Sequence, residues 1–186
     1  MSKNKDIDQI IEREDLGEDT VRFFVWSVWS FFKNTSGADP EIGTPYLFDK
    51  FKHSDYTGVI GVSGSQKGAV YVTMEKGLLE KAIAFQYPDV INGNFNDADL
   101  EEMRVDYAGE IANIISGNAR NYLGRQFLIS VPVVVTAPDT QMHIDNCTKG
   151  IIFPVHWNNT SCHIILCLEK NENNELAGVP ELENAI

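Results

Sequence analysis

Residues 98–123 read ADLEEMRVDYAGEIANIISGNARNYL, and apolar residues recur in this segment at the spacing of a long amphipathic helix. On a helical wheel with roughly 100° between residues, Glu110 and Asn113 share one face, and Met103, Asp106 and Gly117 lie within about 60° of Glu110. The opposite face collects Ala108, Ile111, Ala112, Ile115, Ala119 and Tyr122. We therefore expect a core-facing stripe and a polar stripe, with Glu110 and Asn113 one turn apart and both pointing into solvent.

Apolar side chains border the polar stripe, because Met103, Tyr107 and Ile114 flank Glu110 and Asn113 on the wheel. A surface that mixes charged, amide and apolar groups suits docking against another protein.

Gly117 adds to this expectation. A glycine inside a helix costs about 1 kcal/mol relative to alanine and usually indicates the close approach of another group. Either another helix of the same chain or a partner protein could be that group, and the sequence leaves both open.

Two runs of strand-like sequence precede this helix, at residues 57–62 and 69–74, and the glycine-rich residues 64–68 between them predict a hairpin. Helical spacing returns at residues 75–86 and ends before Pro88. Residues 89–97, rich in Asn, Asp and Gly, form the loop that leads into the long helix.

The sequence after Gly124 is strand-like again. It predicts a strand over residues 127–135 that bends at Pro132, then strands over 150–157 and 162–169 with a turn at 158–161. The fold class expected from this order is α/β, an antiparallel sheet with the long helices packed on one face.

An earlier helix is expected from the acids of its first turn, Glu18 and Asp19, to the stop signals Gly37 and Pro40. Its apolar stripe comprises Val21, Phe24, Val25, Val28, Trp29 and Phe32. Phe23, Trp26 and Phe31 fall largely off that stripe, so the helix is apolar nearly all round. It should make a second contact, either inside this chain or at an oligomer seam.

The length of 186 residues and the hydrophobic content of 43% suit one compact domain. We expect a charged N-terminal arm at residues 1–16, the domain at 17–169, and an acidic, flexible tail at 170–186.

The chain carries 15 Lys and Arg against 27 Asp and Glu, a net charge of −12 that argues against nucleic acid as a partner. Three cysteines form no paired framework, the charged N-terminus has no apolar signal-peptide core, and the apolar run 21–32 is about half of a membrane span. A soluble, cytoplasmic protein without membrane association is expected.

Other candidate sites are weak. The histidines and cysteines near the C-terminus match no recognised zinc spacing, and Cys162 and His163 would face opposite sides of a strand; the set is His143, Cys147, His156, Cys162 and His163. We therefore expect no metal ligands. Ser63 and Ser65 lie among glycines before another strand, which indicates a turn rather than a nucleophile elbow.

The E-x-x-N spacing of Glu110 and Asn113 is a weak signal alone, and its sequence context adds the specificity. The string from Asp106 through Glu110-Ile111-Ala112-Asn113-Ile114-Ile115-Ser116-Gly117-Asn118-Ala119 resembles the signature of the CheC, CheX and FliY phosphatases. Within that group the likeness is to CheX, the form with a single such helix.

The resemblance extends over roughly residues 42–168. The strings that also resemble the CheX strand and helix series are GVIGVSG at 58–64, KGAVYV at 67–72, the helix at 78–85 and SVPVVV at 130–135. The charged N-terminus and acidic tail depart from the family pattern.

The resemblance implies a phosphatase that hydrolyses the phospho-aspartate of a CheY-like response regulator in a two-component pathway such as chemotaxis. Asn113 would orient the attacking water, and Glu110 would pair with a lysine in the regulator's active site. Asp106 would have a supporting role. Mg²⁺ would be held by the regulator rather than by this chain, which would bind no cofactor.

A homodimer is expected, both from the resemblance to CheX and from the over-apolar helix at 21–32. Two alternatives remain open: a non-catalytic CheX-like module that docks on a response regulator, and a structural component of a flagellar switch. The sequence leaves the regulator and the pathway undetermined.

Overall fold

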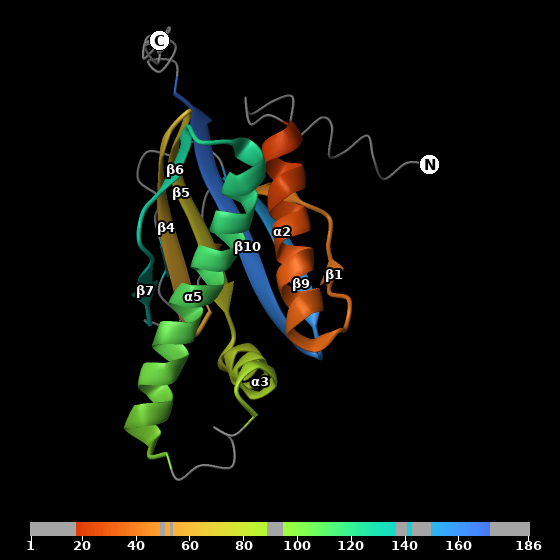
Figure 1. Ribbon diagram of the computed structural model, residues 1–186, viewed down its shortest axis with the longest axis vertical. Coiled ribbons are helices and arrows are strands. Elements are labelled where there is room, and N and C mark those ends of the chain that lie inside the picture. The colour runs from red at the N-terminus through yellow and green to blue at the C-terminus, as the bar shows by residue number, and fades with distance from the viewer. Residues whose placement is uncertain are drawn as a thin grey trace, which may run out of the picture.

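The long helix packs on the face of an antiparallel sheet in a computed structural model that describes residues 18–48, 51–52, 54–88, 95–136, 141–142 and 150–171 (Figure 1). The helices in these ranges are α2 (Glu18–Ser36), α3 (Lys76–Gln86) and α5 (Asp97–Leu123). The strands are β1 (Glu41–Ile42), β2 (Tyr46–Phe48), β3 (Phe51–Lys52), β4 (Tyr56–Gly64), β5 (Gln66–Met74), β6 (Phe127–Ile129), β7 (Val133–Val135), β8 (Gln141–Met142), β9 (Gly150–Trp157) and β10 (Thr160–Lys170).

Eight of these strands form one sheet in the order β1-β9-β10-β5-β4-β6, with β2 also pairing β9 and β7 also pairing β4. Every pairing is antiparallel, including that of the separate ribbon β3–β8. Figure 1 shows α2 and α5 side by side on one face, with α3 next to the N-terminal half of α5. The predicted fold class, an antiparallel sheet with long helices on one face, is confirmed.

The two predicted hairpins are present with tighter turns than expected. Strand β4 ends at Gly64 and strand β5 begins at Gln66, so a single residue separates them. Their register pairs Val62 with Gly68. In the second hairpin Asn158 and Asn159 have φ of 48° and 59°, so two left-handed residues form the turn and Thr160 already pairs with Trp157. Asparagine tolerates this conformation better than most residues, which explains the compact turn.

The predicted bend at Pro132 is a bulge in the edge strand. Ile129 pairs with Val62 and Val133 pairs with Val59, so four steps along β6–β7 match three steps along β4. The hydroxyl of Ser130 accepts a hydrogen bond of 2.9 Å from the amide of Gly61, which holds the two strands together across the bulge.

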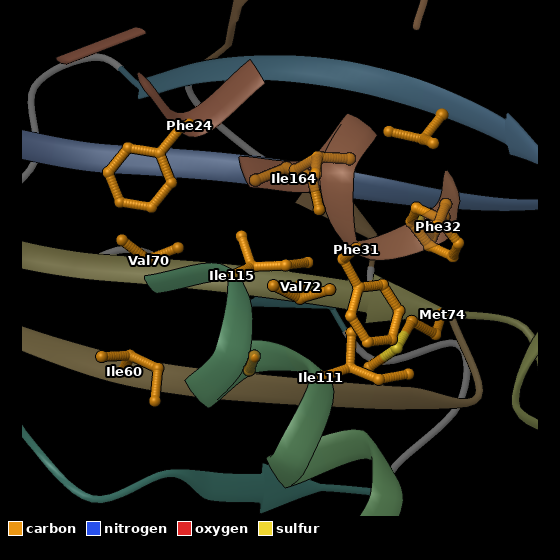
Figure 2. Close-up of a cluster of buried hydrophobic side chains, with 14 of the residues drawn as sticks. Phe24, Phe31, Phe32, Ile60, Val70, Val72, Met74, Ile111, Ile115 and Ile164 are labelled. Carbon is orange, nitrogen blue, oxygen red and sulfur yellow. The ribbon is translucent and has the colours of Figure 1, made fainter. Parts of the chain in front are cut away.

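The core lies between the sheet and helices α2 and α5 (Figure 2). Figure 2 shows the rings of α2 and the isoleucines of α5 packed against apolar side chains of three central strands. The labelled residues are Phe24, Phe31, Phe32, Ile60, Val70, Val72, Met74, Ile111, Ile115 and Ile164, all of them buried. Burial of this apolar surface is the main favourable contribution to folding.

Helix α2 makes the second contact expected of it, and it makes that contact within the chain. The rings of Phe23 and Trp26 lie 5.0 and 4.8 Å from the ring of Tyr122 in α5. Two placements from the helical wheels are wrong, because Trp29 of α2 is 40% exposed and Tyr122 of α5 is 51% exposed. Phe31, which fell off the apolar stripe of α2, is only 7% exposed. Because α2 packs against both the sheet and α5, its buried arc is shifted from the stripe read off the sequence.

Four strands were not predicted. Strands β1, β2, β3 and β8 contain only two or three residues each, too few to show an alternating pattern. Lys170, which we placed at the start of the tail, is the last residue of β10 and pairs with Gln66. The arm at residues 1–16 and the tail beyond Asn171 lie outside the described residues.

Helix α5 approaches strand β4 very closely at Gly58. A Cβ atom added to Gly58 would lie 2.6 Å from the Cβ atom of Ala112 and 2.9 Å from the carbonyl oxygen of Ala108. The helix therefore rests on the strand with only glycine and alanine between the two backbones.

We predict that Gly58→Ala lowers the free energy of unfolding by about 1–3 kcal/mol, because the added methyl group would push α5 away from the sheet. The matched control is Gly77→Ala, where the added Cβ would lie 3.8 Å from the Cγ2 atom of Thr160, an ordinary contact, and should leave stability unchanged or raise it. Urea unfolding measures both. A Gly58→Ala protein as stable as the wild type would contradict this account of the packing.

Candidate functional site

Helix α5 runs unbroken through the candidate site, and both of its ends are capped. The side chain of Asn96 accepts hydrogen bonds from the amides of Ala98 and Asp99, at 2.9 and 3.0 Å. The side chain of Asp99 accepts from the amide of Asn96, which completes a capping box. At the other end the amide of Gly124 donates to the carbonyl of Arg120 at 2.9 Å.

The polar stripe of α5 faces away from the core, as the periodicity predicts. Asp106, Glu110 and Asn113 are exposed, and Met103 and Ile114 are half-buried beside them. The opposite face is buried from Ala108 to Ala119, whereas Tyr122 near its end is exposed. Within the described part of the chain, no hydrogen bond or ion pair engages the side chain of Glu110 or Asn113.

The prediction that Tyr107 borders the stripe at the surface is wrong, because Tyr107 is only 5% exposed. Its ring contacts the ring of Tyr87, which follows the last residue of α3, at a centroid distance of 6.2 Å and an angle of 76°. Burial, with the negative charge of Glu110 and the nearby Tyr87, raises the pKa of Tyr107 to about 12. The aromatic residue that reaches the surface here is Tyr87, which is 42% exposed and which the sequence did not single out.

Strand β7 forms the other border of the stripe. A Cβ atom added to Gly109 would lie 3.3 Å from the Cγ2 atom of Val134 and 3.5 Å from the Cγ atom of Pro132. Gly109 thus lets the bulged edge strand lie against α5 one residue before Glu110. The stripe is bordered by α3 on one side and by β7 on the other.

Gly117 lies beyond Asn113 on the same face, and a Cβ atom added there would meet nothing within 4 Å. Of the two explanations for this glycine, close packing by another helix of the chain therefore finds no support in the described residues. The helix carries unfilled space beside Asn113.

A charged cluster holds α3 against α5. The guanidinium of Arg104 contacts Glu80 of α3 at 2.9 Å and Glu101 of α5 at 3.1 Å. The hydroxyl of Tyr56 donates to the same Glu101 carboxylate at 2.7 Å, and burial together with this carboxylate raises the pKa of Tyr56 to about 12. Because the side chain of Arg104 is only 11% exposed, these ion pairs are shielded better than surface pairs.

The rival sites gain no support from the geometry. The described residues contain no group of three or more His, Cys, Asp or Glu side chains suited to hold a metal ion, and His143 and Cys147 lie outside them. Cys162 is buried, and burial raises the pKa of its thiol, whereas its neighbour His163 is only half-buried. Ser63 belongs to β4 rather than to the predicted turn, and it pairs there with Leu128 of β6.

Among the described residues, no helix is long and apolar enough to cross a membrane.

Comparison with solved structures finds the same fold in other proteins. The structure superposes on a CheC-like superfamily protein from Shewanella sp. PV-4 with a TM-score of 0.70 and 24% identity, over 82% of this chain and 99% of that one. It superposes on the chemotaxis protein CheX from a Desulfovibrio desulfuricans subspecies with a TM-score of 0.68 and 24% identity, over 81% and 99% of the two chains.

A third solved structure is the complex of CheX, CheY, BeF3 and Mg²⁺ from Borrelia burgdorferi. It is similar with a TM-score of 0.60 and 19% identity, over 81% of this chain and 98% of that one. A search of curated proteins gave no match.

The family model described as "Chemotaxis phosphatase CheX" matches residues 56–156, more than half of the sequence. The chain belongs to the CheX family. The matched segment contains the whole of α5 and both elements that border its polar stripe.

The burial of Tyr107 predicts a pH effect. Its pKa rises from 10.0 to about 12 on folding, so between these values the unfolded chain loses the proton while the folded protein keeps it. The stabilisation is complete below pH 10 and is lost as the pH rises towards about 12. Tyr107→Phe should therefore weaken the fall in unfolding free energy over this interval.

Tyrosinate absorbance measured against pH, on the wild type and on Tyr107→Phe, checks the assignment. The variant should lose one tyrosine from the phase that titrates near pH 12. If the number of tyrosines in the high-pH phase is unchanged, Tyr107 does not ionise near pH 12 and the assignment is wrong.

Proposed function

We propose that this protein hydrolyses the phospho-aspartate of a CheY-like response regulator. Asn113 orients the attacking water, and Glu110 pairs with the lysine of the regulator's active site. The observation that carries the proposal is the exposure of Glu110 and Asn113 one turn apart on a capped helix of a CheX-family protein.

Hydrolysis of an acyl phosphate depends mainly on the position of the water and on stabilisation of charge. The amide of Asn113 suits this task, because its oxygen can accept a hydrogen bond from the water while its NH2 group donates to a phosphoryl oxygen. No metal ion or strong base is required from this chain.

A carboxylate beside a phosphoryl group would be repelled by it, so Glu110 is better suited to a cation of the partner. Asp106, one turn earlier and also exposed, supports the same contact. We assign partner contacts to Met103, Ile114 and Gly117 as well, since the space at Gly117 lets another surface approach the helix. Tyr107 is excluded from direct contact by its burial.

Mg²⁺ belongs to the regulator in this proposal. The similar structure from Borrelia burgdorferi contains CheX together with CheY, BeF3 and Mg²⁺. A cytoplasmic location follows from the proposed partner. The homodimer expected from the sequence stays a prediction.

Asn113→Ala should lower kcat at least about 100-fold, because the variant loses the group that positions the water. The regulator should still bind, since the substitution removes little contact surface. Phosphate release from a panel of phosphorylated response regulators measures turnover. The control is Asn121→Ala, an exposed asparagine two turns further along α5, which should behave as the wild type. Turnover retained by Asn113→Ala would refute the assignment.

Glu110→Ala should instead weaken the complex, by up to about 2–5 kcal/mol, as expected when one partner of a desolvated ion pair is removed. Titration calorimetry with the regulator in its beryllofluoride and Mg²⁺ form measures the affinity. Glu102→Ala removes another exposed carboxylate, about two turns nearer the start of α5, and serves as the control. Equal affinities for wild type and Glu110→Ala would make Glu110 an ordinary surface residue.

A further inference from the structure

Tyr87 presents an aromatic ring to solvent at the border of the polar stripe, yet it comes from a different element than Glu110 and Asn113. It is the C-cap residue of α3, where its amide donates to the carbonyl of Ile83 at 2.7 Å. Pro88 follows it and prevents the helix from continuing. The backbone that carries the ring is therefore fixed by the end of α3.

The place of Tyr87 relative to α5 is fixed as well. Its ring meets Tyr107 edge to face, and Tyr107 precedes Glu110 by one helical turn. The ion pair between Arg104 of α5 and Glu80 of α3, with 2.9 Å between the charged atoms, holds the two helices together. Tyr87 is thus an exposed ring on a rigid support, next to the part of α5 that carries Glu110.

The other exposed aromatic residues of the described chain lie elsewhere: Trp29 is on α2, and Phe95 precedes the N-cap of α5, about four turns before Glu110. Trp26 contacts Tyr122, three turns beyond Glu110, and Phe85 contacts Trp157 at 5.7 Å. Tyr46 lies on β2, at the opposite edge of the sheet from β6 and β7. Among the ring contacts of the described residues, that of Tyr87 with Tyr107 is the one that brings an exposed ring to the turn of α5 preceding Glu110.

We propose that Tyr87 is a substrate-recognition residue of this site, whose exposed ring contacts the response regulator on the α3 side of Glu110. This inference rests on the proposed function and adds a contact from outside α5. Tyrosine is favoured in such a role, because it buries a large ring at a small cost in side-chain entropy and keeps a hydroxyl for hydrogen bonding.

The position of the ring also sets what it can do. The ring of Tyr87 meets Tyr107, which lies one helical turn before Glu110, the residue proposed to pair with the regulator's lysine. It should therefore act on affinity and selectivity for the regulator rather than on the water that Asn113 orients. Regulators with an apolar or aromatic side chain beside the active-site lysine would be preferred.

The test uses Tyr87→Ala, Tyr87→Phe and the control Tyr46→Ala, in which a tyrosine of comparable exposure, 47% against 42%, is removed far from the site. The substrate is the phosphorylated regulator that the wild type hydrolyses fastest, and the same regulator with beryllofluoride and Mg²⁺ serves for binding. Tyr87→Ala should raise KM and Kd about tenfold with a much smaller change in kcat. Tyr87→Phe should stay within about threefold of the wild type, since it keeps the ring.

The inference is overturned if KM and Kd of Tyr87→Ala stay within about twofold of the wild type, or if Tyr46→Ala weakens binding equally. It is also overturned if Tyr87→Ala lowers kcat and leaves KM unchanged, because that pattern indicates distortion of α5. Failure of the proposed function looks different: Asn113→Ala would then turn over like the wild type, whatever Tyr87→Ala does.

Discussion

Helix α5 rests on strand β4 through contacts too close for even a methyl group at Gly58, where the backbone of the strand meets Ala108 and Ala112. This contact fixes the rotation of the helix about its own axis. A rotation by one residue, roughly 100°, would turn Ala112 away and bring a carboxylate or amide of the polar stripe towards the core. Burying such a group without a partner is costly, so the packing of the small residues and the exposure of Glu110 and Asn113 support each other.

The surroundings of the stripe come from segments that lie far apart in the sequence. The end of α3 places Tyr87 on one side, and the bulged edge strand places Pro132 and Val134 on the other. The ion pairs of Arg104 hold α3 against α5, and the caps keep α5 helical to both of its ends. Groups that act on a partner's bound phosphate gain from such rigid support, because catalysis by positioning tolerates little movement.

Local signals predicted most of the fold. Residues 98–123 of α5, the two hairpins and the break at Pro132 each follow from periodicity or from turn residues within one segment. The shortest strands gave no such signal. The helical wheel misplaced Trp29, Tyr107 and Tyr122, because it describes one helix and their burial depends on a neighbouring element. Tyr87 was missed for the same reason, since only the packing of α3 on α5 places it near Glu110. The exposure of Glu110 and Asn113 followed from spacing, whereas their proposed roles came from the resemblance to CheX.

The central claim is that these two side chains belong to an enzyme rather than to a docking module. The most direct measurement is phosphate release with the phosphorylated regulator in large molar excess over this protein. The account predicts many equivalents of phosphate for each protein molecule, above the regulator's own rate of hydrolysis. Tight binding with no more than one equivalent released would contradict it and would identify a binding module or a switch component instead.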